Sequence, residues 1–281
     1  MPTRRIAKRI LALIKIDRQF IRRGSIAMAR TWTRDEEILA FALYCKTPFG
    51  KIHSRNDEIV RLADVLGRTP GSVSMKMCNF ARFDEQLHAR GVVGLSNGSH
   101  LDEEVWNDFS KNMEFLEEKS KQVLLRLRVS EEANEQDPDL PVGETTRVEA
   151  NARINQSFFR QTVLSNYAGA CCITGLAMPS LLTASHIKPW KDSDPRTERT
   201  NPRNGLCLNA LHDRAFDRGL ITVTTDYRVI VSKQIKDFYN MEVVQEFFGK
   251  YDGKKIELPE KFLPARQFIE FHNTNIFERL G

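Results

Sequence analysis

Apolar residues recur at the period of a helix in the first part of the chain. Residues 33–45 carry one apolar stripe, and Thr33 followed by Glu36 is a capping-box signature for its start. Residues 57–66 repeat the pattern and precede Gly67, a residue type that commonly ends helices. Two amphipathic helices are therefore predicted, one after the other.

A third helix is predicted directly behind them. Thr69 and Pro70 supply an N-cap and a proline at the first helical position, and an apolar face follows. Two helices joined by a short turn that contains glycine have the outline of a helix-turn-helix, whose second helix enters the major groove of DNA. In that arrangement the residues expected to contact DNA are Arg68, Ser72, Ser74, Lys76 and Asn79. A plain helical hairpin is the alternative.

The chain changes character between two predicted domains. Residues 102–128 continue the helical pattern, whereas residues 130–146 are rich in Asp and Glu and contain no Lys or Arg. Such a polar, acidic stretch is typical of a solvated linker. We therefore expect a helical domain over residues 28–128, an acidic linker over 129–149 and a second domain over 150–281.

The second domain has a mixed pattern, so the fold class expected for the whole chain is α+β. Its predicted elements are a helix over 157–167, strands over 171–174 and 181–187, a polar loop over 188–203, a helical segment over 206–216 and a hairpin over 220–232. The Phe-rich segment that follows predicts more helix closing the core.

The positive charge of the chain is concentrated at its start. The 281 residues carry a net charge of +5, and residues 1–27 are rich in Arg and Lys with Asp17 as their sole acid. Three interpretations of this basic segment stay open: an arm that binds nucleic acid or a membrane surface, an organelle presequence, or an upstream start codon with Met28 as the true start. The rest of the chain is close to neutral, so bulk charge gives little support to nucleic-acid binding.

Hydropathy and cysteine content narrow the class of protein further. No apolar run approaches the roughly 20 residues needed to cross a bilayer, so no membrane partner is expected. Five Cys cannot pair fully, which favours a reducing compartment, the cytoplasm. The function must then be argued from a local site.

Three polar residues stand in an otherwise apolar frame in the second domain. His186 ends a predicted strand, Asn204 precedes an apolar run, and His212 begins the residues that lead to Gly219. The ordered segments around them are CITG at 172–175, ASHIKPW at 184–190, NGLCL at 204–208 and HDRAFDRG at 212–219. In these segments the chain resembles the HNH nuclease family, which has the ββα-metal fold, and in particular its restriction-endonuclease-like branch.

The resemblance implies cleavage of phosphodiester bonds with a divalent metal ion. His186 would be the general base, because a neutral imidazole can take a proton at cellular pH. Asn204 resembles the family's orienting or loop-fixing Asn, and His212 resembles its metal ligand on the helix. The expected catalytic set is therefore His186, Asn204 and His212.

One departure from the family leaves the metal site incomplete. Many HNH proteins carry Asp or His directly before the base, whereas here that residue is Ser185, whose hydroxyl is a poor ligand. Asp217 is the candidate for the second ligand and Asp213 the reserve. Lys188 and Arg214 are expected to contact flanking phosphates because they lie close to the motif in sequence.

A second departure concerns zinc. Cys172 aligns with a zinc-binding Cys of many HNH domains, but Gly175 stands in its partner's place and Cys207 is alone, so no structural zinc is expected. One divalent ion is expected, with Mg²⁺ first and Mn²⁺ or Ni²⁺ as alternatives.

The resemblance as a whole implies a DNA endonuclease, of restriction or phage-defence type, that cuts double-stranded DNA. Cutting both strands with one active site per chain suggests a homodimer. Two alternatives stay open: a non-catalytic DNA-binding regulator that keeps an HNH scaffold, and an RNA-cutting nuclease.

Overall fold

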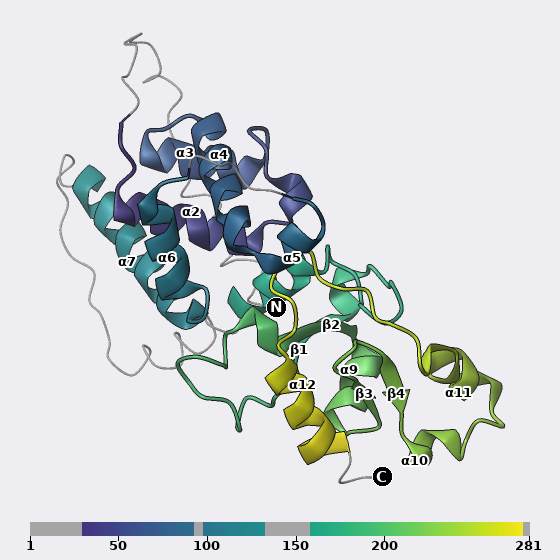
Figure 1. The fold of residues 1–281 in the computed structure, drawn as a ribbon. Helices are drawn as coiled ribbons and strands as arrows, with labels where there is room; N and C mark the ends of the chain where they lie inside the picture. Colours follow the sequence, from purple (N-terminus) through teal and green to yellow (C-terminus); the bar gives the residue numbers. More distant parts are fainter. Residues whose placement is uncertain (1–29, 93–97, 133–157, 278–281) are drawn as a thin grey trace. The chain divides into compact units, whose positions relative to one another are not determined.

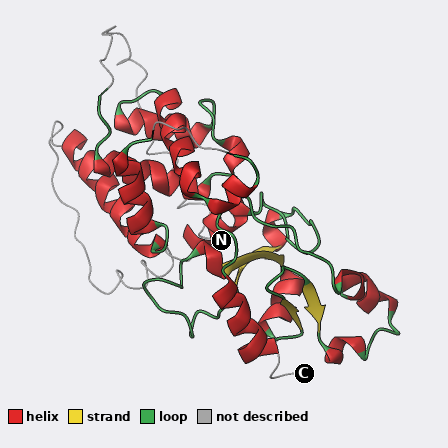
Figure 2. Cartoon of the chain, in the orientation of Figure 1, coloured by secondary structure: helices red, strands yellow, loops and turns green. Residues whose placement is uncertain are grey.

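A computed structural model describes residues 30–92, 98–132 and 158–277. The basic segment 1–27, Met28 and most of the predicted acidic linker lie outside the described residues. None of the described helices is long and apolar enough to cross a membrane. Figure 2 shows that the described chain is mainly helical and has two small sheets, which agrees with the α+β class.

Three helices in the first half follow the predicted pattern. They are α2 (Arg34–Lys46), α3 (Asp57–Leu66) and α4 (Pro70–Phe80), as labelled in Figure 1. Thr33 and Glu36 cap α2 reciprocally, as their spacing predicts. Gly67 ends α3 with φ +59°, a left-handed conformation that glycine adopts without strain. These three helix predictions are confirmed.

The helical pattern of residues 102–128 is divided between two helices. They are α6 (His100–Phe109) and α7 (Met113–Glu132), and the short α5 (Glu85–Ala89) precedes them. The side chain of Asn112 accepts a hydrogen bond from the backbone N–H of Phe115, so it caps the start of α7. The aromatic residues Phe41, Tyr44, Phe80 and Trp106 form the centre of this helical part.

The second half is built on an antiparallel pair of strands followed by a helix. Its elements are a helix over 158–166, η3 (Pro179–Leu181), β1 (Leu182–His186), η4 (Pro202–Asn204), β2 (Gly205–Asn209), α9 (Ala210–Asp217), β3 (Ile221–Val223) and β4 (Val229–Val231). β1 pairs with β2 so that His186 lies opposite Gly205, and β3 pairs with β4. The predicted strand at 181–187 and the hairpin are confirmed.

Two element predictions in this half are wrong. Residues 171–174 form turns, because the N–H of Gly175 bonds back to the carbonyl of Cys171. Residues 206–209 are strand rather than helix, since they pair with β1 along its whole length. The helix begins at Ala210, where the side chain of Asn209 accepts the first free backbone N–H groups.

The C-terminal segment adds α10 (Lys233–Lys236), α11 (Glu242–Phe247), η5 (Gly249–Tyr251), α12 (Arg266–His272) and η6 (Asn273–Phe277). His272 joins α12 to the rest of this half. Its Nδ1 lies 2.8 Å from the Thr222 hydroxyl of β3, its Nε2 donates to the Phe216 carbonyl at 3.0 Å, and its ring stacks on Phe216. The helix is thereby fixed against β3 and α9.

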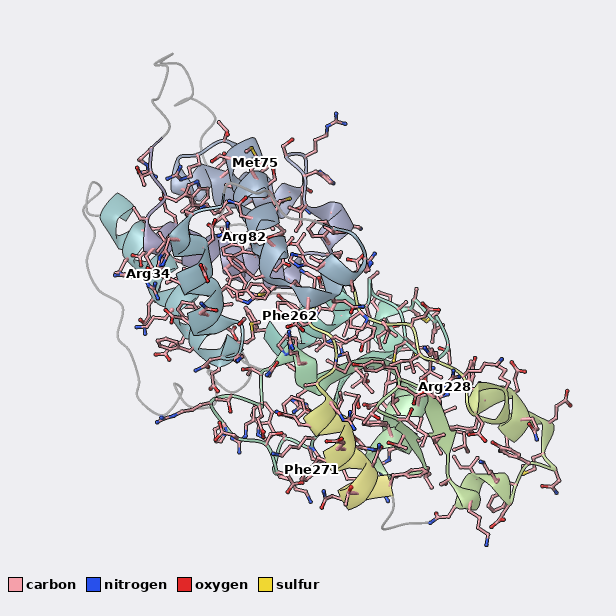
Figure 3. All side chains as sticks on the ribbon, in the orientation of Figure 1. Arg34, Met75, Arg82, Arg228, Phe262 and Phe271 are labelled. Carbon is pink, nitrogen blue, oxygen red and sulfur yellow. The ribbon has the colours of Figure 1, made fainter. Side chains whose placement is uncertain are left out.

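Residues 260–262 bond to the helices of the first half. Glu260 accepts a hydrogen bond from the Phe49 N–H at 2.9 Å. The buried Lys261 ammonium donates to the carbonyls of Tyr44 and Thr47. The ring of Phe262, labelled in Figure 3, stacks on Trp106. These contacts join the two predicted domains. The boundaries of the domains stay a prediction.

Candidate active site

A cleft of ≈ 1260 Å³ opens beside the end of β1. The polar and charged residues that line it include His186, Lys191, Asp213, Arg214, Asp217 and Arg218. The C-terminal segment contributes Phe271, labelled in Figure 3, together with Asn275 and Ile276. Elements far apart in the sequence therefore form its walls.

The two ring nitrogens of His186 have different surroundings. Nε2 lies 2.7 Å from the carbonyl oxygen of Arg199, and because a carbonyl can only accept, Nε2 carries the hydrogen. In the neutral ring Nδ1 is then the acceptor, and it has no hydrogen-bond partner among the described residues. Burial lowers the pKa of His186, and the hydrogen bond to Arg199 opposes this more weakly. The ring is therefore a neutral base at pH 7.

Two aromatic rings contact the imidazole of His186. Phe159 stacks on it with the ring centroids 4.1 Å apart and the planes 12° from parallel. Trp190 meets it edge-on at 5.6 Å and 86°. The imidazole is thus held at its end by a carbonyl and on one face by a phenyl ring.

Asp213 and Asp217 lie one turn apart on α9 and both line the cleft. Desolvation raises the pKa of Asp213, against the lowering effect of the Ser185 and Thr183 hydroxyls. Desolvation also raises the pKa of Asp217, and the charge of Asp213 adds to it. Asp217 is the more exposed of the two, so solvent screening weakens its pKa shift. Most of the desolvation cost of the pair therefore falls on Asp213. Burial is the main cause of both shifts.

His212 is placed differently from the expectation. It is buried, with Nδ1 3.0 Å from Asn209 Oδ1 and Nε2 2.9 Å from the Phe247 carbonyl. Phe248 and Tyr251 contact its ring. The structure therefore brings Asp213 and Asp217 to the cleft beside His186 and does not bring His212 there. Adjacent residues on a helix are about 100° apart, which explains why His212 and Asp213 face different surroundings.

Asn204 is fully buried and fixes the loop that follows β1. Its Oδ1 accepts from the Lys188 N–H at 2.8 Å, and its Nδ2 donates to the carbonyls of Lys188 and Glu198 and to the Ser193 hydroxyl. This loop leads to Arg199, whose carbonyl binds His186. The arrangement corresponds to the loop-fixing role and keeps Asn204 itself out of the cleft.

Residues 171–224 match the protein-family model described as HNH endonuclease. This match supports the recognition of the segment as a member of the HNH nuclease family. No curated protein matches the chain. The match covers His186, Asn204 and α9, and it leaves Phe159 and the C-terminal residues of the cleft outside.

The phosphate-contacting residues expected in the HNH domain are only partly in the cleft. Arg214 lines it, and so do Lys191 and Arg218, which are not among the residues predicted from the sequence. Lys188 instead forms an ion pair with Glu198 at 2.6 Å. The i, i+4 spacing of Arg214 and Arg218 was the signal that could have indicated the second arginine.

The residues expected to read DNA in the helical half are tied to internal partners. Arg68 pairs with Glu36 at 2.9 Å, and both side chains are almost fully buried. Lys76 is buried between Glu37 and Asp102, at 2.8 and 2.6 Å.

The remaining members of that set have local partners. The Asn79 amide donates to the same Asp102 at 3.2 Å. Ser72 is half-buried, and its backbone N–H is taken by the Thr69 cap. Ser74 donates to the carbonyl of Gly71. The structure thus places most of these polar groups in contacts that hold α2, α4 and α6 together.

The donor set of the cleft fits a hard divalent cation. Within the described residues no three His, Cys, Asp or Glu side chains form a ready ligand cluster. Mg²⁺ is commonly held by one or two carboxylates, with water and substrate phosphate completing its shell. Asp213 and Asp217 provide such a pair, and their raised pKa values show that a positive charge beside them would be stabilising.

Proposed function

We propose that this chain is a metal-dependent DNA endonuclease that hydrolyses phosphodiester bonds in the cleft beside β1. The observation that carries the proposal is the hydrogen bond from His186 Nε2 to the Arg199 carbonyl. It leaves Nδ1 as an acceptor without a partner in the described part of the chain, and His186 lines the same cleft as Asp213 and Asp217. A base and a cation-binding carboxylate pair at one cleft are what metal-assisted hydrolysis requires.

His186 acts as the general base in this proposal. Nδ1 takes a proton from the attacking water, and the resulting imidazolium keeps its Nε2–H bond to Arg199. The carbonyl oxygen stabilises this positive charge without itself changing protonation state. Asn204 contributes by holding the loop that carries Arg199, so it is a positioning residue.

Asp213 and Asp217 would hold the divalent ion. When bound, such an ion stabilises the charge that develops on the phosphate and the leaving oxygen. Mg²⁺ or Mn²⁺ suits two carboxylates better than a softer ion does, and Ni²⁺ is the weaker alternative because the donor set contains no nitrogen. His212, the ligand expected from the family resemblance, stays a candidate that the test below separates from the carboxylates.

The cations of the cleft support a nucleic-acid substrate. Lys191, Arg214 and Arg218 line it and can meet the phosphates on either side of the scissile bond. Double-stranded DNA cut in a restriction or phage-defence role is the proposed substrate and setting, and a homodimer would allow both strands to be cut.

The test is digestion of supercoiled plasmid in Mg²⁺, Mn²⁺ or Ni²⁺ by the full chain and by His186→Ala. We expect nicked or linear DNA with the wild type, and a loss on the order of 100-fold or more with the variant. Equal cutting by both proteins would remove His186 from the proposal. If the protein cuts in none of these metals but still binds DNA in a gel shift, the alternative of a non-catalytic regulator is supported. Ser185 at the position of a family metal ligand is the observation that keeps this alternative open. Faster digestion of RNA in parallel would identify a ribonuclease instead.

A further inference from the structure

We propose that Phe159 is a positioning residue for the reaction. Its ring stacks on the imidazole of His186 and keeps it in the orientation in which Nδ1 is available to the substrate. The inference rests on the proposed function of His186 and adds a residue that lies outside the segment matched by the HNH family model.

The geometry of the two rings carries the argument. The phenyl ring of Phe159 lies 4.1 Å from the imidazole and nearly parallel to it. Phe159 is itself almost fully buried, so its ring is fixed by the core and cannot swing away. With Nε2 bonded to Arg199 and one face covered by Phe159, rotation of the imidazole about its side-chain bonds would break the hydrogen bond or the stack.

The strand opposite His186 is shaped to admit this ring. Gly205 is the residue paired with His186 across β1 and β2. A methyl group at that position would lie 3.0 Å from Cζ of Phe159 and 2.5 Å from Cγ2 of Val163. Gly205 therefore provides the space through which the helix over 158–166 reaches the underside of the site.

A purely structural role is the competing explanation, because Phe159 also belongs to the hydrophobic core. The chain offers a matched control in Val163. It lies on the same helix, is buried, and approaches the same Gly205, but it has no ring to stack on His186. Shortening Val163 perturbs the core near Gly205 but leaves the stacking of Phe159 on His186 in place.

The experiment compares Phe159→Leu with Val163→Ala in the full chain. Phe159→Leu keeps an apolar side chain but removes the flat face. We expect it to lower kcat about 10- to 100-fold while KM for plasmid stays within about twofold, since a displaced base affects the chemical step more than binding. Val163→Ala should keep kcat within about threefold of the wild type at a temperature where both variants are folded.

A readout that does not need activity accompanies the kinetics. Nitrogen NMR of labelled histidine, with His186→Ala used to assign the signals, reports which ring nitrogen carries the hydrogen and whether the ring has one orientation. We expect the Nε2–H form in the wild type and in Val163→Ala, and a mixture of tautomers or a broadened signal in Phe159→Leu.

The outcomes separate the two proposals. A wild-type chain that cuts no substrate, but whose His186 signal changes only in Phe159→Leu, would overturn the nuclease function and leave the positioning of the ring intact. If Phe159→Leu and Val163→Ala lower kcat alike and leave the His186 signal unchanged, Phe159 is a core residue only and the inference fails.

Discussion

Asp213 lines the cleft, whereas His212, the residue before it in α9, is buried with Nε2 bonded to the Phe247 carbonyl. The start of α9 decides between them. Because β2 continues to Asn209 and the helix begins at Ala210, the face that meets the cleft carries positions 213 and 217. Both carboxylates therefore line the cleft, whereas the imidazole of His212 packs against Phe247 and its neighbours.

Substitutions on α9 should distinguish the two ligand sets. Asp213→Asn and Asp217→Asn should each weaken Mn²⁺ binding about tenfold or more, because each removes a charged donor. His212→Ala should leave the Mn²⁺ affinity of the folded protein within about twofold and reduce the free energy of unfolding by about 1–3 kcal/mol, since it leaves a buried carbonyl unpaired. Calorimetric titration and urea unfolding measure the two quantities. A loss of Mn²⁺ binding in folded His212→Ala would restore the imidazole as a ligand.

The pH profile of cleavage should follow the neutral form of His186. Burial lowers the pKa of this residue, so the base stays deprotonated to a lower pH than an exposed histidine does. We expect kcat to fall only below about pH 6.5, the ordinary value for histidine. Single-turnover rates measured from pH 5 to pH 8 at saturating Mn²⁺ give the profile. An acidic limb centred above pH 7 would contradict a buried, neutral base.

Stability should decline in acid because of His272. Its burial lowers its pKa to about 4, whereas the unfolded chain has the ordinary value near 6.5. Between these values the unfolded state binds a proton that the folded state does not, so the free energy of unfolding falls as the pH is lowered through this range, by about 3 kcal/mol from this residue. Urea unfolding of the wild type and of His272→Gln from pH 7 to pH 4 tests it. The difference in stability between the two proteins should narrow as the pH falls, and parallel curves would refute the assignment.

Lys76 should matter for folding rather than for DNA. Its ammonium group donates to the buried carboxyl groups of both Glu37 and Asp102, and desolvation raises the pKa of Glu37 to about 7 even with Lys76 present. Lys76→Met should therefore lower the free energy of unfolding by about 3–5 kcal/mol, because two buried acids lose their cation.

Met75, the neighbouring exposed residue on α4, provides the control. Met75→Ala should change the free energy of unfolding by less than about 0.5 kcal/mol. DNA affinity measured on the folded fraction of Lys76→Met should match that of the wild type. A drop in affinity without loss of stability would return Lys76 to the proposed reading face.

The sequence predicted well those features that depend on local order. The caps and apolar faces of α2, α3 and α4, the strand that ends at His186, and the HNH segments all depend on neighbouring residues, and these predictions hold. The face presented by α9 depends on where β2 ends, which is set by pairing with β1 across the loop. A shift of the helix start by a few residues rotates every later position, so spacing alone did not separate His212 from Asp213.

Long-range partners account for the other differences. Lys76 lies on the predicted DNA-reading helix and Arg68 lies just before it. Their carboxylate partners, however, come from α2 and α6: Glu36 for Arg68, and Glu37 and Asp102 for Lys76. Nothing in a local window indicates such pairing. The contact between Phe159 and His186 could likewise not be predicted from the sequence, because only folding brings the helix over 158–166 next to Gly205.

The walls of the cleft have a practical consequence for dissecting this protein. A fragment trimmed to residues 171–224 would lack Phe159, whose ring stacks on His186. It would also lack Phe271, Asn275 and Ile276, which line the cleft from the C-terminal segment. His272, which anchors that last helix through Thr222 and Phe216, would go with them. A fragment that keeps the whole cleft therefore has to include residues 158–277, more than twice the span matched by the family model. Such a fragment would still lack the partners of Lys261 and Phe262 in the first half, so the full chain is the form to study.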